Sequence, residues 1–196
     1  MTPPQKLKKQ TFILLGAIVL ILGLVGCESL FSPPKSELPT YSVKRISDGD
    51  TLAVTDSSGN SISVRFACMD APEVPHTNAE KQSRKAVDKN QFKWGVQAQQ
   101  RVQQLVTQGG DRVNLTVTDT DRYGRKVSEV RLPDGTLVQE VLIRDGLAMV
   151  YQAYLKNCPS ATVVQQAEAE AKKSRRGVWG DSKFVEPWDY RRISKK

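Results

Sequence analysis

Charged side chains of both signs lie close together in one short stretch of the chain. Arg65 occurs within an otherwise apolar or small-residue run from Val64 to Met69, and two acids, Asp70 and Glu73, follow it. The run is typical of a half-buried strand, and Pro72 ends that strand because it cannot donate a ladder hydrogen bond. We therefore expect Arg65 to project from a strand and both acids to lie on its exit turn. A structural ion pair is the alternative to a catalytic role.

Two more charged positions would complete a catalytic site with these residues. Asp50 and Arg125 each follow a polar turn elsewhere in the chain. Two Asp side chains, a backbone carbonyl and waters suit a hard cation such as Ca²⁺ or Mg²⁺. Glu73 can orient or deprotonate a water, and Arg65 and Arg125 can each donate two hydrogen bonds to a phosphate. This combination predicts hydrolysis of a phosphodiester.

The composition narrows the chemistry further. The chain has a single histidine, His76, so zinc sites built from several histidines and nucleases that use a histidine base are excluded, and we expect His76 to be a loop residue. Lysine and arginine number 29 against 21 acids, a net charge of +8. A basic excess favours anionic partners such as nucleic acid or anionic lipid.

Five short strands are expected to position these residues. The first three are joined by short turns and form a meander, and the last two flank the polar turn that ends in Arg125. The predicted strands cover residues 41–46, 51–55, 61–69, 111–118 and 126–132.

Three helices follow from apolar residues that recur at helical spacing. They cover residues 94–107, 136–144 and 160–176, the last with Ser160 as its N-cap. The polar stretch 76–93 is expected to be a mobile loop. Five strands with helices inserted after the third and the fifth indicate an α+β, mainly β domain, namely a five-stranded OB-fold barrel with three packed helices.

The N-terminal segment is typical of a secretory signal. Residues 1–26 combine three lysines, no acid and a short apolar run, and Leu-Val-Gly before Cys27 resembles the lipobox of bacterial lipoproteins. The resemblance implies removal of residues 1–26 and acylation of Cys27, which becomes a lipid anchor. An uncleaved membrane anchor is the alternative. Either way we expect the domain to lie in the cell envelope, facing the periplasm or the exterior.

The rest of the chain is predicted to form one folded domain with a short segment on either side. Residues 27–40, rich in Pro and Ser, read as a flexible tether, residues 41–180 as the folded domain and residues 181–196 as a C-terminal tail. Two cysteines remain after lipidation, Cys68 and Cys158. In an oxidising compartment this pair invites a disulfide, and two separately buried thiols are the alternative.

Several motifs then occur together in a family's order. They are Asp48-Gly49-Asp50-Thr51, Arg65 with Asp70-Ala71-Pro72-Glu73, Asp121-Arg122-Tyr123-Gly124-Arg125 and Gly177-Val178-Trp179. They resemble the thermonuclease family typified by staphylococcal nuclease, and the resemblance extends from Tyr41 to about Trp179. It implies a Ca²⁺-dependent endo- and exonuclease that acts on DNA and RNA and leaves 3′-phosphate ends.

The resemblance also implies roles for individual residues. Asp50 and Asp70 would bind the ion with the carbonyl of Ala71, and Asp48 would support them nearby. The remaining assignments are Glu73 as general base or water-orienting group, Arg65 and Arg125 on the phosphate, Arg122 beside the phosphate-facing turn and Tyr154 near the nucleotide base. Gln152 stands where the type member has a tyrosine, with Tyr151 next to it.

The main alternative to the nuclease is an inactive OB-fold module that binds nucleic acid or protein. Such a module would be expected to lack Asp50, Glu73 or one of the arginines, and all of these are present. A third reading is a basic surface lipoprotein whose acids merely pair with arginines. We expect a monomer in each case.

Overall fold

A computed structural model of the chain describes residues 39–194. The predicted signal segment, Cys27 and all but the last two residues of the predicted tether lie outside this range. Among the described residues, no helix is both long enough and apolar enough to cross a membrane.

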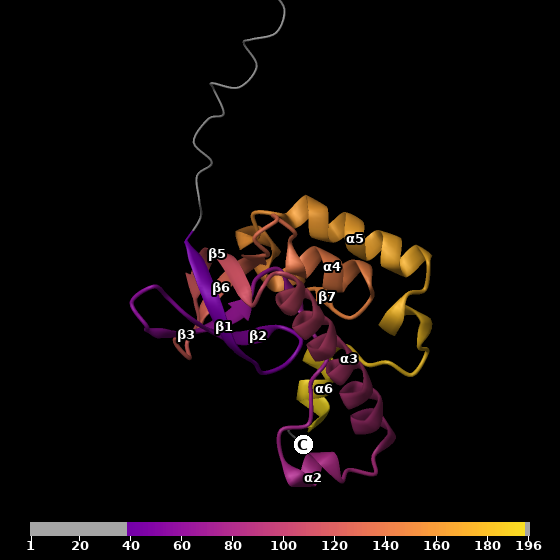
Figure 1. Cartoon of the computed structure of the whole chain (residues 1–196). Coiled ribbons are helices and arrows are strands. Elements are labelled where there is room, and N and C mark those ends of the chain that lie inside the picture. The colour runs from indigo at the N-terminus through magenta and orange to yellow at the C-terminus, as the bar shows by residue number, and fades with distance from the viewer. Residues whose placement is uncertain (1–38, 195–196) are drawn as a thin grey trace, which may run out of the picture. The chain divides into compact units, whose positions relative to one another are not determined.

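The described chain is built on a closed five-stranded barrel, as the sequence predicts (Figure 1). Antiparallel pairing of the first three strands forms the expected meander. The barrel closes where β5 pairs antiparallel with β1 and where β6 pairs parallel with β3. The strands are β1 (Thr40–Ile46), β2 (Thr51–Thr55), β3 (Ser61–Phe66), β5 (Arg112–Thr120) and β6 (Lys126–Arg131).

The third strand ends earlier than the sequence predicts. β3 stops at Phe66, and Cys68 adopts a left-handed backbone conformation with φ +71°. This turn takes the chain out of the barrel, so the next two residues form a separate strand, β4 (Met69–Asp70), which pairs with β7 (Met149–Val150). The prediction of one strand through Met69, with Asp70 on its exit turn, is therefore wrong. Alternation of side chains cannot reveal a break when every residue around it is buried.

The same turn is joined to the other end of the domain by a disulfide. Cys68 is bonded to Cys158 across a sequence separation of 90 residues, with the two Cα atoms 5.3 Å apart. The predicted pairing is thus present, and the separately buried thiols are excluded. The bond links the segment before Asp70 to the start of α5 (Ala161–Lys173).

The stretch predicted as a mobile loop is largely helical, which corrects that prediction. It contains α2 (Asn78–Lys81) and the first turns of α3 (Ala86–Gln108), which starts eight residues before the predicted helix. Thr77 and Glu80 form a capping box at α2, and this S/T-x-x-E spacing was visible in the sequence. The early part of α3 has few apolar residues, so hydrophobic periodicity missed it.

Two further helices pack against each other, and the first of them also contacts α3 and β6. α4 (Val138–Arg144) and α5 both fall within their predicted ranges, and short 3₁₀ turns, η1 (Gln152–Asn157) and η2 (Gly177–Gly180), flank α5. Ser160 occupies the N-cap position of α5 without a side-chain capping bond. Instead, buried Glu129 accepts from the Ser160 backbone N–H at 2.6 Å and from its hydroxyl at 3.0 Å.

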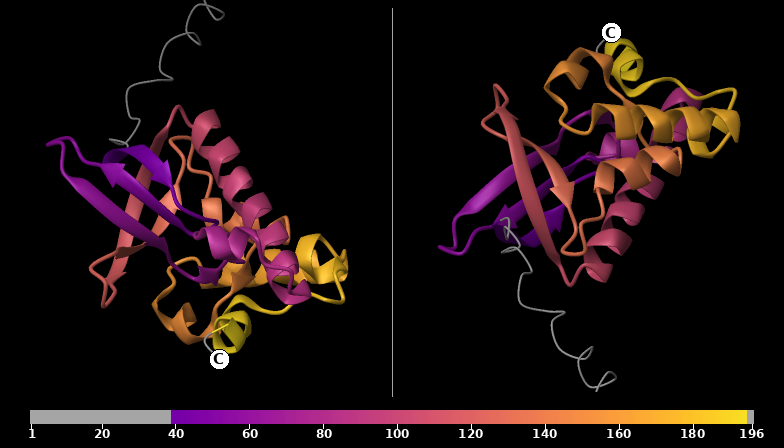
Figure 2. Two further views of the ribbon diagram at one scale, coloured as in Figure 1. Left: turned by 90° about the horizontal axis from the view of Figure 1, so that it is seen from below. Right: turned by 90° about the horizontal axis from the view of Figure 1, so that it is seen from above.

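The predicted C-terminal tail contains a further helix, α6 (Pro187–Ser194), packed beside α3 (Figure 2). Tyr190 anchors α6, because its side chain is buried, its ring meets Phe92 of α3 edge-on at 6.1 Å and its hydroxyl donates to Asp88 at 3.1 Å. Burial among these groups and the charge of Asp88 raise the pKa of Tyr190. Residues 187–194 are thus an ordered part of the domain.

One continuous hydrophobic core joins the barrel to α3, α4 and α5. Leu52, Val64 and Phe66 supply it from the barrel, and Val102 and Leu142 supply it from the helices. The site residues described next therefore emerge from one packed unit, which fixes their backbones.

Candidate active site

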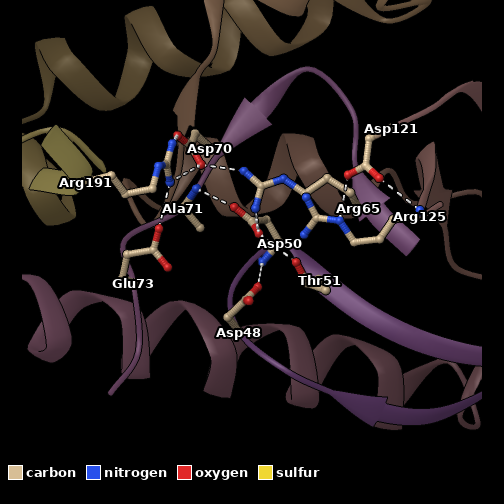
Figure 3. A network of polar contacts seen from close by, with 10 residues as sticks. All are labelled: Asp48, Asp50, Thr51, Arg65, Asp70, Ala71, Glu73, Asp121, Arg125 and Arg191. Atoms are coloured by element: carbon tan, nitrogen blue, oxygen red, sulfur yellow. Dashed lines mark hydrogen bonds and ion pairs between the residues drawn. The ribbon is translucent and has the colours of Figure 1, made fainter. Parts of the chain in front are cut away.

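Arg65 lies between two buried acids that are 20 residues apart in the sequence (Figure 3). Its Nη1 donates to Asp50 Oδ1, and its Nη2 donates to Asp70 Oδ1 at 2.5 Å. Asp50 and Asp70 are only 2% and 1% exposed. Burial by itself would lower the pKa of Arg65, but the two carboxylates outweigh burial and raise it. The predicted neighbours are therefore brought together around one guanidinium.

Asp50 is held from three directions. Besides Arg65, the Thr51 hydroxyl donates to Oδ1 at 3.1 Å and the backbone N–H of Ala71 donates to Oδ2 at 2.8 Å. Burial raises the pKa of Asp50, Arg65 opposes this shift, and the charges of Asp48 and Asp70 add to it. The carboxylate is thus kept in a position where a nearby positive charge is strongly favourable.

The turn that carries Asp50 is shaped by its own side chains. The Asp48 carboxylate accepts from the Asp50 N–H at 2.9 Å. A Cβ at Gly49 would lie 2.6 Å from the Cβ of Ala98 and 2.8 Å from that of Ala71, so only glycine lets this turn lie against α3 and the Ala71 segment. This close approach places Asp48 and Asp50 beside Asp70.

Arg125 is oriented by Asp121 within the turn between β5 and β6. Asp121 Oδ1 accepts from the Arg125 N–H at 2.9 Å, and Oδ2 accepts from Arg125 Nε at 2.7 Å. Burial acts to raise the pKa of Asp121, but the bonds from Arg125 outweigh burial and lower it. Figure 3 shows the guanidinium of Arg125 pointing toward Arg65. The sequence motif contained Asp121, but its orienting role was not anticipated.

A single cleft of about 790 Å³ receives most of the predicted site residues. Arg65 and Arg125 both line it, so the two arginines face the same space. Asp50 and Ala71 lie behind the lining, next to Arg65. The other predicted residues that line the cleft are Asp48, Asp70, Glu73, Arg122 and Tyr154, and His76 lies at the cleft as well.

Aromatic side chains form one wall of this cleft. Tyr154 is 59% exposed, and its ring centroid lies 5.0 Å from that of Tyr151. The ring of Tyr151 in turn lies 5.5 Å from Trp188 of α6. Exposed aromatic faces beside arginines can stack on unpaired bases. Tyr151 thus supplies an aromatic ring next to Gln152.

One arginine of the site, Arg191 of α6, is not predicted from the sequence. Its guanidinium contacts Asp70 and Glu73 from the side opposite Arg65 (Figure 3). These carboxylates outweigh the effect of burial and raise the pKa of Arg191. Pro187 at the first helical position and Asp189 in the first turn are helix-start signals that could have revealed α6.

The donor atoms fit a hydrated hard cation better than a fully protein-bound metal. Asp50 and Asp70 both form ion pairs with the guanidinium of Arg65, so a positive charge is favourable between these two carboxylates. Within residues 39–194, the only three His, Cys, Asp or Glu side chains with ligand atoms mutually within 4.8 Å are Cys68, Glu129 and Cys158, and the two sulfurs are bonded to each other. Two carboxylates with waters remain suited to Ca²⁺.

The fold and the site together define an OB-fold barrel with acids and arginines gathered at one cleft. The chain belongs to the family of staphylococcal nuclease homologues, whose family model matches residues 63–181. It is 34% identical over 149 residues to an uncharacterized endonuclease of Escherichia coli O157:H7, covering 76% of this chain and 82% of that protein.

Two further relatives show similar coverage. A micrococcal nuclease of Shigella flexneri is 34% identical over 161 residues, 78% of this chain and 80% of the relative. An uncharacterized endonuclease of Haemophilus influenzae is 30% identical over 177 residues, 90% of this chain and 86% of the relative.

Proposed function

We propose that this protein is a Ca²⁺-dependent nuclease that hydrolyses phosphodiester bonds of DNA and RNA and leaves 3′-phosphate ends. The observation that carries the proposal is that Arg65 joins Asp50 and Asp70 beside the cleft that Arg125 and Glu73 also line. The family and the endonuclease names of the relatives support the nuclease activity. The acidic donor set supports Ca²⁺.

Each residue has a role that its position allows. Asp50 and Asp70, with the carbonyl of Ala71, would hold the cation, which when bound supplies positive charge beside the scissile phosphate. Arg65 and Arg125 donate to the phosphate oxygens and neutralise charge that develops there. Glu73 orients a water or takes its proton, and its side chain lines the cleft where such a water would lie.

Substrate outside the reacting phosphate would be held by the rest of the cleft. Arg122 lies 4.9 Å over the ring of Tyr123 at the turn that carries Arg125, so its charge faces the path of a phosphate backbone. Tyr154 and Tyr151 offer their rings to unpaired bases. Asp48 acts by holding the Asp50 turn.

An inactive binding module is the second candidate. It would use the same basic cleft without cleaving the bound strand. The enzyme is favoured because every charged residue that the proposed reaction needs is present in one site. These residues are Asp50, Asp70, Glu73, Arg65 and Arg125.

The test is a cleavage assay on single-stranded DNA and on RNA over a Ca²⁺ titration at mildly alkaline pH. We expect cleavage with Ca²⁺, none with chelator, and losses of orders of magnitude in Arg125→Ala and Glu73→Ser with the fold retained. Product ends are read by sensitivity to a 3′-phosphatase. Binding of nucleic acid without cleavage at any Ca²⁺ concentration would establish the binding module instead.

We further propose that Cys27 is acylated and anchors a monomeric domain in the cell envelope. The bond between Cys68 and Cys158 supports an oxidising compartment, since such bonds are rare in the reducing cytosol. Membrane fractionation of the wild type and of Cys27→Ser tests the anchor. Equal distribution of the two proteins between membrane and soluble fractions would exclude it.

A further inference from the structure

Arg191 reaches the candidate active site from outside the part of the chain that the family model matches. The match ends at residue 181, and α6 begins at Pro187. α6 is held in place independently of Arg191, because Tyr190 packs on Phe92 and donates to Asp88. The packing of α6 on α3 therefore sets the position of Arg191 beside the acids.

Arg191 completes the set of guanidinium contacts to Asp70. Arg65 donates to Asp70 Oδ1, and Arg191 Nη2 donates to Oδ2, while its Nη1 also lies 3.2 Å from Oδ1. Both oxygens of this 1% exposed carboxylate are thus engaged by arginine. The same Nη1 donates to Glu73 Oε1 at 2.7 Å.

These contacts conflict with the roles of the two acids. A carboxylate has about four acceptor sites, and the two arginines take three of those on Asp70, so a cation must compete with them for its oxygens. Arg191 also occupies the Glu73 oxygen that a water would approach. Two positive groups that share one carboxylate bind it in competition, so each lowers the affinity of the other.

Resting on the proposed function, we propose that Arg191 is an autoinhibitory residue that competes with the divalent cation for Asp70 and covers Glu73 until the cation displaces it. Its side chain is 36% exposed and lines the cleft, so it can swing away while Tyr190 keeps α6 docked. The domain would then have low activity at low Ca²⁺ and full activity once the cation has replaced the arginine.

Calorimetric Ca²⁺ binding in the absence of nucleic acid tests this directly. We expect Arg191→Gln to bind Ca²⁺ about tenfold more tightly than the wild type, because one positive charge is removed from the site. Arg191→Lys should fall between them, since an ammonium cannot contact both acids as a guanidinium does. In the cleavage assay, the Ca²⁺ concentration for half-maximal rate should fall in parallel.

Arg192→Gln is the matched control. Arg192 is the next residue of the same helix, its side chain is 79% exposed and it pairs with Asp189 instead of the site acids. We expect its Kd for Ca²⁺ to match the wild type, and an equal gain in both Gln variants would show a general charge effect and overturn the proposal.

The remaining outcomes separate this inference from the proposed function. If the wild type binds Ca²⁺ and cleaves DNA but Arg191→Gln binds no more tightly, only the autoinhibition is wrong. If Arg191→Gln does not fold, Arg191→Lys decides the question, and an unchanged Kd in that variant overturns it. Absence of both Ca²⁺ binding and cleavage in the wild type and both Arg191 variants would refute both proposals.

Discussion

Gly95 of α3 lies directly against the backbone of Glu73. A Cβ at residue 95 would lie 2.0 Å from the Glu73 carbonyl oxygen and 2.8 Å from that of Pro72, which no real structure tolerates. The glycine therefore lets the segment that carries Glu73 rest on the helix. The helix in turn holds Glu73, the proposed general base, at the depth where it lines the cleft.

Gly95→Ala should lower both activity and stability. Alanine normally stabilises a helix by about 1 kcal/mol relative to glycine. A net loss of stability would therefore reveal the forced shift of Glu73. A displacement near 1 Å is expected to reduce kcat by about 100-fold, and overpacking should cost roughly 1–3 kcal/mol. Steady-state kinetics and urea unfolding measure the two effects. Gln103→Ala, at an exposed position of α3, is the control. A Gly95→Ala protein with wild-type kinetics would contradict this account.

Asp121→Asn should release Arg125 without removing it. The amide cannot replace the charged bond to Arg125 Nε, so we expect kcat/KM to fall by roughly tenfold, less than in Arg125→Ala. Asp134→Asn is the control, because Asp134 likewise accepts from a backbone N–H two residues on but holds no arginine. A wild-type kcat/KM in Asp121→Asn would contradict the orienting role of Asp121.

Removing the disulfide should destabilise the domain considerably. The bond joins residues 90 positions apart and so constrains the unfolded chain. Losing that constraint should lower the free energy of unfolding by about 4–5 kcal/mol. Denaturant unfolding of the wild type against the double variant Cys68→Ala/Cys158→Ala gives the value. Mass spectrometry of the non-reduced protein should find both cysteines in one linked peptide pair, and free thiols at both positions would contradict the structure.

Asp181 should make stability depend on pH. Trp94 Nε1 and Asn90 Nδ2 donate to its carboxylate at 2.9 and 2.8 Å, and these bonds lower the pKa of Asp181 below its ordinary 3.8. Because the pKa of Asp181 is lower in the folded state, the carboxylate stabilises the fold at pH values above its unfolded pKa. This stabilisation is lost as the pH falls through its folded pKa. The difference in unfolding free energy between wild type and Asp181→Asn should therefore shrink as pH is lowered from 6 toward 2. A constant difference over that range would show that Asp181 acts without its charge.

The sequence by itself was enough to predict the barrel and most of the residues that gather at its candidate active site. Strand alternation and turn residues are local signals, so the meander and the positions of Asp50, Arg65 and Arg125 could be predicted from short segments. The motifs around these residues also sufficed to indicate a family. By contrast, the helix over residues 86–93 was missed, because its buried face is largely polar and its register depends on partners such as Asp181.

Only the tertiary structure decided how the charges pair. The break at Cys68 and the approach of Gly95 to Glu73 depend on elements that meet only after folding. Arg191 is the clearest case, since 118 residues separate it from Glu73 and 121 from Asp70. No local pattern links residues so far apart, because their contact arises from the packing of Tyr190 against α3.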